Sequence, residues 1–396
     1  MTTKAGVGTS RHHNPDVAGR EAAQQALREA SIAKADFVFM FATVGYDQRS
    51  LLQAVREATG GAPLSGCSAE GTISGDEADE SNFSVVVMAI SSEELRWTNG
   101  LATGLRTDSL PAGQQVAEGV SSDLGADAVG LFIFPDGTTV NFDHLFAGLE
   151  GNLPNDRFLP IWGGGAGDNF AMRQTYQYCN DEIASDGVAY TLLSGEVLPA
   201  WAIDVGYVPI GGERTVTRSQ GNVIYEIDGK PALEVFHEYL PDPALAENWG
   251  AGLANSFALC FRAPNYIKDE DYIFRAVLSV NKAEGSLTLA TEVQEGTSVW
   301  FSSRNPEKVT TGLDLMATQI KQQLGDTQPK LVFHFDCTAR GKIMFRDQEK
   351  LRILRRFRQA VGLDIPWVGF YTYGEIGPVG KHNCHHNYTA VVLALS

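Results

Sequence analysis

The feature that most constrains this chain is a unit of two apolar strands joined by a helix and followed by a glycine-rich loop, which occurs three times. The first unit starts at Asp36, the second at Asp127 and the third at Pro329. In the first unit we predict strands at 36–43, 63–66 and 83–90, a helix at 50–59 and the loop at 66–71. In the second we predict strands at 128–134, 158–162, 174–179 and 187–193, a helix at 140–148 and the loop at 163–168. In the third we predict strands at 331–336, 366–370 and 388–394, a helix at 348–361 and the loop at 371–378. Identity between the units is weak, so the shared pattern alone indicates duplication of one supersecondary unit.

These units predict the fold class. Parallel strands that are joined by a helix form right-handed crossovers, and ligands usually bind beyond the carboxyl ends of such strands. All three glycine-rich loops follow a strand at a position of this kind. We therefore expect an α/β protein of two domains, built from repeated strand–helix–strand units with mixed sheets packed against helices.

The segments outside the units complete the predicted organisation. Residues 1–34 are expected to form an arm, mobile up to residue 16, and a helix at 19–31. In the first unit we expect Ser50 to cap the helix, and we place a domain boundary near Gly211–Gly221. Between the second and third units the chain predicts a helix at 231–239, strands at 256–261, 272–279, 286–290 and 298–301, and a helix at 308–324.

The charge of the chain argues against several classes of function. Its 31 Lys and Arg against 48 Asp and Glu give a formal net charge of −17, which opposes binding to nucleic acid and to anionic membranes. The start of the chain has no apolar stretch of the kind that a signal peptide needs, and the apolar runs are far shorter than the ~20 residues of a membrane-spanning helix. The five cysteines form no CxxC pair, as expected of reduced thiols. We expect a cytoplasmic protein.

The first glycine-rich loop, Gly66–Gly71, contains Cys67 and Ser68 and raises the hypothesis of nucleophilic catalysis. A nucleophile needs a base within reach, yet no serine lies in a GxSxG sequence and no histidine is near this loop along the chain. One alternative is a tight turn around a small buried thiol. The other is a ligand loop whose backbone N–H groups face an anion or polar group. We expect no enzyme activity and keep catalysis through Cys67 as an alternative.

The second and third loops differ in what they predict. Gly163–Asp168 contains GxGxG but is followed by residues that favour a strand, whereas a dinucleotide fingerprint needs a helix after the glycines. In Tyr371–Pro378, aromatic and polar residues alternate before a turn that we expect Pro378 to lock. One interpretation is a structural turn after a core strand. The other places Tyr373 and Glu375 in a ligand pocket.

Four segments, in this order, resemble the FIST family of sensory proteins: GCSAEGTISG, WGGGAGDN, FDCTARG and GFYTYGEIGP. The resemblance covers nearly the whole chain and implies a FIST N domain at 35–225 and a FIST C domain within 226–396. It also implies an input domain for small ligands, with amino acids proposed for many members and with histidine kinases, cyclic-di-GMP enzymes or chemotaxis receptors as partners. The candidate ligand-binding residues are Gly66, Cys67, Ser68, Gly165, Asp168, Arg340, Tyr371, Tyr373 and Glu375.

A subgroup of stand-alone FIST proteins, which this chain resembles in length, implies a haem cofactor. Its members are bacterial nitric-oxide sensors that hold haem b through a histidine and regulate a separate histidine kinase or diguanylate cyclase. The lack of CxxCH excludes covalent attachment, and haem b needs one axial histidine in an apolar pocket. We rank His386 first, His237 second and His334 third. A zinc site in the HNCHH segment with Cys384 is disfavoured, because the spacing is too tight for separated ligand pairs.

The helix at 348–361 has a basic face in an acidic protein, formed by Lys350, Arg352, Arg355, Arg356 and Arg358. This face is either the solvated side of a core helix or a place for an acidic partner, a ligand carboxylate or haem propionates.

Taken together, these features predict a sensor that binds a small ligand between its domains and signals by protein contact, through a population shift. With haem, a gas binds opposite His386 or another histidine. Without haem, an amino acid binds: arginine and loop N–H groups hold its carboxylate, and Glu375 or Asp168 holds its ammonium. We expect neither nucleic acid nor membrane as a partner, and a homo-oligomer is left open.

Overall fold

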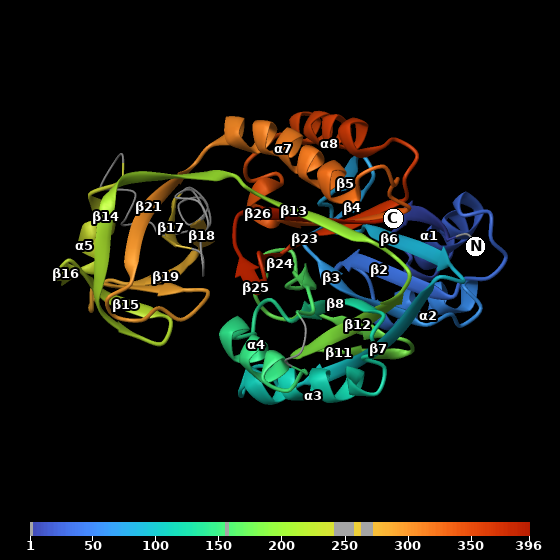
Figure 1. Cartoon of the computed structure of the whole chain (residues 1–396), viewed down its shortest axis with the longest axis horizontal. Coiled ribbons are helices and arrows are strands. Elements are labelled where there is room, and N and C mark those ends of the chain that lie inside the picture. The colour runs from blue at the N-terminus through green and yellow to red at the C-terminus, as the bar shows by residue number, and fades with distance from the viewer. Residues whose placement is uncertain (1–2, 155–157, 241–256, 263–271) are drawn as a thin grey trace.

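The protein folds into a large body and a smaller lobe (Figure 1). The structure, a computed structural model, describes residues 3–154, 158–240, 257–262 and 272–396. The body contains the described residues up to 206 and from 305 onward, and the lobe contains those between 207 and 304. The body holds three six-stranded mixed sheets with helices packed on them, so the predicted α/β class is confirmed.

Each sheet of the body has a pair of helices on its outer face. Sheet 1 consists, in spatial order, of β1 (Lys4–Ser10), β6 (Val85–Ser91), β2 (Phe37–Thr43), β3 (Leu64–Ala69), β10 (Gln177–Cys179) and β11 (Glu182–Ala184), with α1 (Pro15–Glu29) and α2 (Gln48–Ala58). Sheet 2 consists of β25 (His382–His386), β24 (Glu375–Val379), β9 (Ile161–Gly164), β8 (Ala128–Pro135), β12 (Gly187–Gly195) and β7 (Leu95–Thr103), with α3 (Ser109–Ser121) and α4 (Phe142–Glu150).

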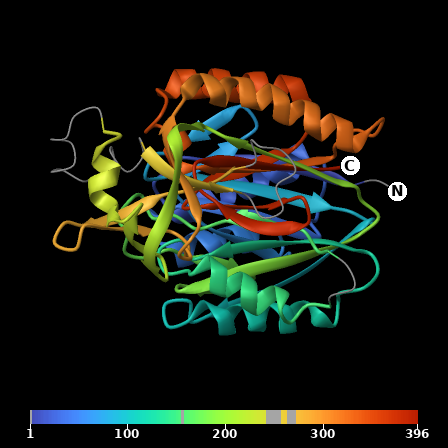
Figure 2. The same cartoon turned by 60° about the vertical axis from the view of Figure 1, so that its left-hand side comes forward.

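Sheet 3 consists of β13 (Pro199–Val205), β26 (Thr389–Leu395), β22 (Leu331–Cys337), β23 (Trp367–Thr372), β4 (Gly71–Ser74) and β5 (Glu77–Asp79), with α7 (Pro306–Leu324) and α8 (Asp347–Val361). Figure 2 shows α7 and α8 on one side of the body and α3 and α4 on the opposite side. The lobe is one sheet of β18 (Tyr272–Arg275), β17 (Phe257–Arg262), β21 (Ser298–Arg304), β14 (Tyr207–Gln220), β15 (Val223–Ile227), β20 (Ser286–Leu289) and β19 (Val277–Asn281), with β16 (Lys230–Pro231) beside β15 and the helix α5 (Ala232–His237).

The three predicted units form the parallel pairs β2/β3, β8/β9 and β22/β23, one in each sheet of the body. After each pair the chain crosses to a different sheet. β4 pairs with β23, β24 pairs with β9, and β10 pairs with β3, all antiparallel. Each unit therefore supplies a strand to one other unit in a closed cycle, which gives the body an approximate threefold arrangement.

A glycine occupies the same place in each unit, in the second strand of the parallel pair. A Cβ atom on Gly66 would lie 1.8 Å from the carbonyl oxygen of Met40 on β2. At Gly163 and Gly369 it would lie 2.0 Å from the carbonyl oxygens of residues 133 and 334 on the matching strands. Backbone atoms cannot yield such space without breaking the ladder, so these three positions require glycine.

The centre of the body is an apolar core between the inner faces of the three sheets. Phe39, Phe132 and Phe333 come from equivalent strands and are completely buried. Their ring centroids are 5.3 Å (Phe39–Phe132), 5.0 Å (Phe39–Phe333) and 4.8 Å (Phe132–Phe333) apart. The alternation of phenylalanine along each strand thus reflects one face that points to the shared core.

Several local predictions were wrong. Residues 4–10 are not a mobile arm but the strand β1, because they pair antiparallel with β6. Asp47, not Ser50, caps α2, since its carboxylate accepts from the Ser50 N–H at 2.8 Å. The segment from Glu375 to Val379 is the strand β24 rather than a turn. The proposed domain boundary, Gly211–Gly221, lies mostly within the strand β14.

Several segments escaped prediction, among them the strands β7 and β13, and one predicted segment lies partly outside the described residues. The helix α3 was not predicted from the sequence. The predicted strand at 256–261 begins at a residue outside the described ones, and its remainder belongs to β17.

Candidate functional site

The three glycine-rich loops meet at the carboxyl ends of the parallel strand pairs. Backbone bonds join them: Glu70 N donates to Tyr371 O at 3.1 Å, Gly167 N to Ser68 O at 3.1 Å, and residue 373 N to residue 165 O at 2.9 Å. Of the sequence-predicted residues, Gly165, Asp168 and Tyr373 lie in this loop junction. The predicted loop at 66–71 is mostly strand, since Gly66, Cys67 and Ser68 belong to β3, and Glu375 begins β24. Three loops that are far apart in the sequence are therefore neighbours in space.

Two carboxylates of the loop junction share the Tyr373 hydroxyl. Tyr373 Oη lies 2.7 Å from Glu70 Oε2 and 3.1 Å from Asp168 Oδ1, and its single proton serves one of them at a time. Phe170 N donates to Glu70 Oε2 at 3.0 Å. Burial raises the pKa of Glu70, and the nearby Asp168 charge adds to the effect.

The carboxylate of Asp168 accepts hydrogen bonds from its own loop. Its two carboxylate oxygens accept from the backbone N–H groups of residues 172, 173 and 174 at 2.9, 2.6 and 3.1 Å. The side chain is almost fully buried. Asp168 therefore shapes the loop and presents little free surface to a ligand ammonium.

The carboxylate of Glu375 also accepts hydrogen bonds from within the protein. It is completely buried and accepts from Thr372 Oγ1 at 2.5 Å, from Thr389 N at 3.0 Å and from Thr389 Oγ1 at 2.8 Å. Burial raises its pKa to about 7, although these bonds oppose the rise. Glu375 thus anchors β24 to β26 rather than lining an open pocket.

Cys67 lies in the central apolar core and is completely buried. Burial raises the pKa of its thiol well above the usual value. A reactive cysteine needs an electropositive, partly exposed surrounding, so the geometry gives no support to nucleophilic catalysis at this position.

Arg340 and Tyr371 lie apart from an open surface, in a buried charge network beneath α8. Arg340 Nη1 binds Asp204 Oδ2 at 3.0 Å and Arg340 Nε binds Asp336 Oδ1 at 2.8 Å, while Lys350 Nζ binds Asp336 Oδ2 at 2.5 Å. Burial alone would raise the pKa of Asp336, but Lys350 and Arg340 hold it at about 2. Tyr371 is fully buried with Lys350 Nζ 5.3 Å from its ring centroid. Two acids thus neutralise Arg340, which is not available for a ligand carboxylate.

The basic face of α8 is mostly paired as well. Arg355 and Arg358 bind Asp76, at 3.0 and 2.8 Å, and Arg356 binds Asp314. These ion pairs agree with the interpretation of a core helix with a solvated basic face.

The three candidate haem ligands occupy different surroundings. His334 is completely buried between Phe357 and Trp367, each 6.0 Å away between ring centroids, which leaves no room for a macrocycle. His237 ends α5 in the lobe. His386 lines a cavity. Its Nε2 lies 2.9 Å from Gly377 O, and because a carbonyl only accepts, this nitrogen carries the proton and Nδ1 keeps its lone pair.

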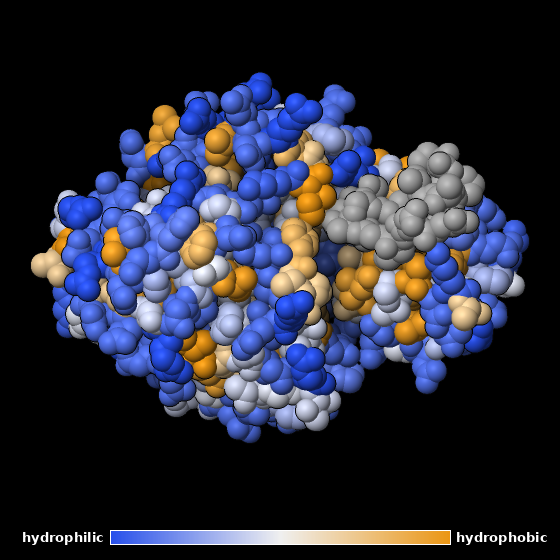
Figure 3. Space-filling view, turned by 180° about the vertical axis from the view of Figure 1, so that it is seen from behind, coloured by the Kyte–Doolittle hydropathy of each residue, from blue (hydrophilic) through white to orange (hydrophobic). Residues whose placement is uncertain are grey.

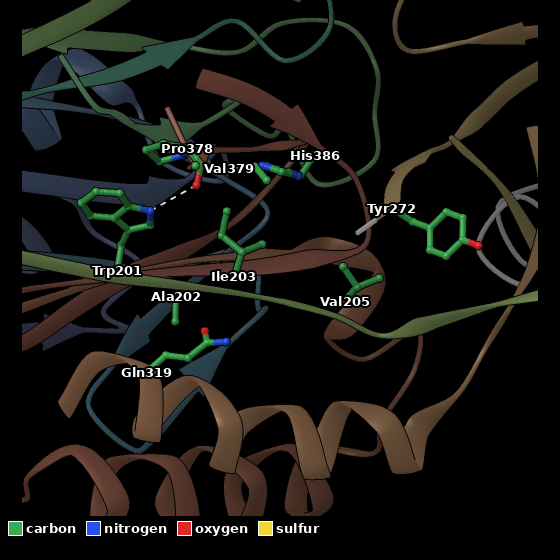
Figure 4. A pocket seen from close by; sticks show the side chains of 10 residues that line it. Trp201, Ala202, Ile203, Val205, Tyr272, Gln319, Pro378, Val379 and His386 are labelled. Atoms are coloured by element: carbon green, nitrogen blue, oxygen red, sulfur yellow. Dashed lines mark hydrogen bonds between the residues drawn. The ribbon is translucent and has the colours of Figure 1, made fainter. Parts of the chain in front are cut away.

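Two cavities are lined by residues of both the body and the lobe. Figure 3 shows a hollow between the two parts on one face of the molecule. The His386 cavity measures about 360 Å³, and Figure 4 shows its lining side chains around the end of the β24–β25 hairpin. The lining includes Trp201, Ile203, Tyr272, Gln319, Pro378 and His386. Trp201 Nε1 donates to Pro378 O at 3.1 Å, which fixes one wall.

The second, which we call the Arg275 cavity, measures about 390 Å³. Its lining includes Asp143, Phe261, Arg262, Arg275, Thr291 and Glu292. Asp143 comes from α4 of the body and the other residues come from the lobe. Asp143 Oδ2 accepts from Glu292 N at 2.7 Å, so the cavity wall includes a direct bond between body and lobe.

Arg275 is held by neutral acceptors. Its Nε donates to Thr291 Oγ1 at 2.6 Å, and its Nη1 donates to Phe274 O at 3.2 Å and to His385 O at 2.7 Å. Burial lowers its pKa to about 10, opposed by the charge of Asp143. Arg262 lies over the rings of Tyr272 and Trp300, 5.0 Å from each centroid. Sequence reasoning missed both residues, although an arginine at the end of the apolar stretch YIFR was the available signal.

Two family models match most of the chain. The FIST N domain model matches residues 36–230, and the FIST C domain model matches residues 232–378. The chain is a FIST domain protein. FIST domains are sensor domains of signal transduction that respond to small ligands. In space, the FIST C match contains part of the lobe and the strands β22, β23 and most of β24 of the body, whereas β14 and β15 of the lobe lie within the FIST N match.

The relatives found by sequence similarity have no assigned activity. Uncharacterised proteins of Mycobacterium tuberculosis and Mycobacterium bovis are 25% identical over 404 and 398 residues, which cover 98% of this chain and 98% and 97% of theirs. Among solved structures, a chorismatase and a cyanuric acid hydrolase from A. caulinodans have TM-scores of 0.37 and 0.38 at 10% identity, covering 100% of this chain and 99% of theirs. Scores this low carry no argument. In the part of the chain that the structure describes, no helix has the length and hydropathy needed to cross a membrane.

Proposed function

We propose that this FIST protein senses a small zwitterion, an amino acid or a close analogue, in the Arg275 cavity. The observation that carries the proposal is the composition of one cavity wall, which contains two guanidinium groups and two carboxylates. A ligand with one carboxylate and one ammonium group matches both signs of charge. The loop junction fits such a ligand less well, because Asp168 and Glu375 are almost fully buried there and bonded within the protein, whereas the charged groups at the other place line a cavity of about 390 Å³.

Each end of the ligand has its own partners in this proposal. Arg275 and Arg262 bind the carboxylate, because charge-assisted bonds from guanidinium to carboxylate are strong and directional. Asp143 and Glu292 bind the ammonium. The ligand then bridges α4 of the body and the strands of the lobe. Binding therefore favours one arrangement of the two parts over others, which is the population shift that a sensor needs. The signal passes to a separate partner, such as a histidine kinase or a diguanylate cyclase.

Calorimetry with a panel of the proteinogenic L-amino acids tests the proposal. We expect at least one to bind, and Arg275→Ala to weaken that binding by tenfold or more, since a hydrogen bond to a charged group contributes about 1.5–3 kcal/mol. Arg218→Ala is the matched control, because Arg218 also lies in the lobe but pairs with Glu226 away from the cavity. No binding to the unmodified protein, or equal binding to Arg275→Ala, would rule this function out.

A second candidate function is haem-based sensing of nitric oxide through His386. The observation in its favour is that His386 lines the His386 cavity beside Trp201, Ile203 and Pro378. Burial lowers the pKa of His386 to about 4, so the ring is neutral, as an axial ligand must be. Haem b would supply an iron that binds a diatomic gas. His386 would hold that group, and the Gly377 carbonyl would fix the orientation of the ring.

An absorption spectrum of protein expressed with a haem precursor, before and after nitric oxide, tests this candidate. A Soret band that shifts with the gas and collapses in His386→Ala, but persists in His382→Ala, supports it. A protein without a Soret band would remove haem from consideration and leave the amino-acid sensor.

A further inference from the structure

The hairpin of β24 and β25 lines the His386 cavity and is bonded to Arg275, a residue that lines the Arg275 cavity. On one side, Arg275 of the Arg275 cavity donates to the backbone oxygen of His385 at 2.7 Å. On the other side, Pro378, Val379 and His386 line the His386 cavity. Ile273 of the lobe packs against Cys384 and Val379 of the same hairpin. A shift of the hairpin therefore alters the His386 cavity and the bond that holds Arg275 in the wall of the other cavity.

The attachment of the hairpin to the rest of sheet 2 is short. β24 pairs with β9 at two positions only, Glu375 with Gly164 and Ile376 with Gly163. Asn383 adds bonds to the Ile161 N–H at 2.8 Å and to a backbone oxygen at residue 159 at 3.0 Å. The body also holds the hairpin through Glu375, which bonds to Thr389 on β26, and through Trp201 Nε1, which donates to Pro378 O at 3.1 Å. The contacts from the lobe add to these restraints at the His385 end of β25.

The lobe holds the end of the hairpin at two adjacent points. One is the bond from Arg275 to the His385 carbonyl. The other is the bond from Ala276 N to Asn387 Oδ1, at 3.0 Å. The first is charge-assisted, and no described carboxylate lies within ion-pair distance of Arg275. Within the described part of the chain, an anion that reaches this guanidinium meets no carboxylate in direct contact.

We infer that the β24–β25 hairpin couples the two cavities, with Arg275 as the link. A carboxylate that binds Arg275 through both Nη atoms competes with the His385 carbonyl for Nη1, and its charge weakens the bond that remains. The hairpin is then held less tightly, and the wall of the His386 cavity that Pro378 and His386 form changes position. By linkage, a molecule in the His386 cavity alters affinity in the Arg275 cavity by the same factor. The identity of the carboxylate rests on the proposed function, whereas the link between Arg275 and the hairpin does not.

Hydrogen exchange of the ligand-free protein, followed by mass spectrometry on peptides that span 375–386, tests the link directly. We expect exchange of the hairpin amides to be about tenfold faster in Arg275→Ala, given the strength of a bond to a charged donor. Arg218→Ala, the control on the lobe, should leave it unchanged. A second readout is the fluorescence contributed by Trp201, taken as the difference from Trp201→Phe in each background, because Trp201 bonds to Pro378 O on the far side of the hairpin.

The outcomes separate this inference from the proposed function. Unchanged hairpin exchange and unchanged Trp201 emission in a folded Arg275→Ala protein would overturn the coupling, even if an amino acid binds. Faster exchange with no amino-acid binding would keep the coupling and remove the proposed ligand. If Arg275→Ala destabilises the lobe, Asn387→Ala cuts the neighbouring link from the body side. Asn387→Ala should increase the exchange of the hairpin amides by the same factor. Unchanged exchange of these amides in Asn387→Ala also overturns the coupling.

Discussion

Truncation of one ring at the centre of the body tests the threefold arrangement. Phe39, Phe132 and Phe333 are each completely buried, and each contacts the other two rings at 4.8–5.3 Å between centroids. Replacing one by alanine removes a large buried side chain and leaves a cavity, which costs about 3–5 kcal/mol. Because the three rings come from equivalent strands, we expect the three single substitutions to cost the same within about 1 kcal/mol.

The rings also interact with one another, so pairs of substitutions should not add. Each single substitution already removes the contact between two rings, worth about 0.5–1.5 kcal/mol. The double variant Phe132→Ala/Phe333→Ala should therefore cost less than the sum of the single variants by about that amount.

Guanidinium chloride denaturation, followed by far-ultraviolet circular dichroism, measures these differences. The lobe has a core of its own, so only the transition of the body should move. Leu315→Ala, at a side chain that is 65% exposed on α7, is the control and should change stability by less than about 0.5 kcal/mol. Single substitutions that cost under about 1 kcal/mol, or a double variant that is strictly additive, would contradict the packing described here.

Three further predictions concern the buried charges and the glycines. Asp336→Ala leaves Arg340 and Lys350 without a shared partner and should cost about 3–5 kcal/mol in urea denaturation. The double variant Asp336→Ala/Lys350→Met should recover part of this loss, and no recovery would argue against the ion pair. The pKa of Glu375 is raised to about 7 by burial, so its stabilising effect is complete below about pH 4.5 and is lost as the pH rises through 7. Relative to Glu375→Gln, the unmodified protein should lose on the order of 3 kcal/mol across this range, and parallel pH profiles would refute the assignment. Gly163→Ala forces a Cβ atom to within 2.0 Å of a backbone oxygen and should cost about 3 kcal/mol by thermal denaturation. Gly212→Ala, which meets nothing within 4 Å, should be nearly neutral, and equal effects of the two would contradict this explanation.

Regular segments with their own local signal were predictable from the sequence. The predicted strand at 331–336 and helix at 348–361 correspond to Leu331–Cys337 and Asp347–Val361. Periodicity and apolar runs are properties of neighbouring residues, so they can be recognised without knowledge of the fold. The small-residue helix α3 had a weaker pattern and was missed. β1 was taken for a mobile arm, because its strand character depends on pairing with β6, about 80 residues away along the chain.

In the candidate site, too, some features were predictable from the sequence and others depend on tertiary packing. The three glycine-rich loops were recognised as neighbours of parallel strands, and the structure places them together at the loop junction. Which side chains remain open to a ligand was not predictable. Glu375 and Arg340 look like ligand-binding residues in isolation, but Thr372 and Thr389 satisfy the first, and Asp204 and Asp336 neutralise the second.

By itself, the sequence determined that this protein is built from three strand–helix–strand units with glycine-rich loops, because apolar runs, helical periodicity and glycine positions are local. Only the tertiary structure decided that the units exchange strands in a cycle, and that the lobe faces the hairpin across the Arg275 cavity. Arg275 reaches the His385 carbonyl across 110 residues of chain. A contact of this kind depends on the packing of whole sheets, and no pattern among adjacent residues encodes it.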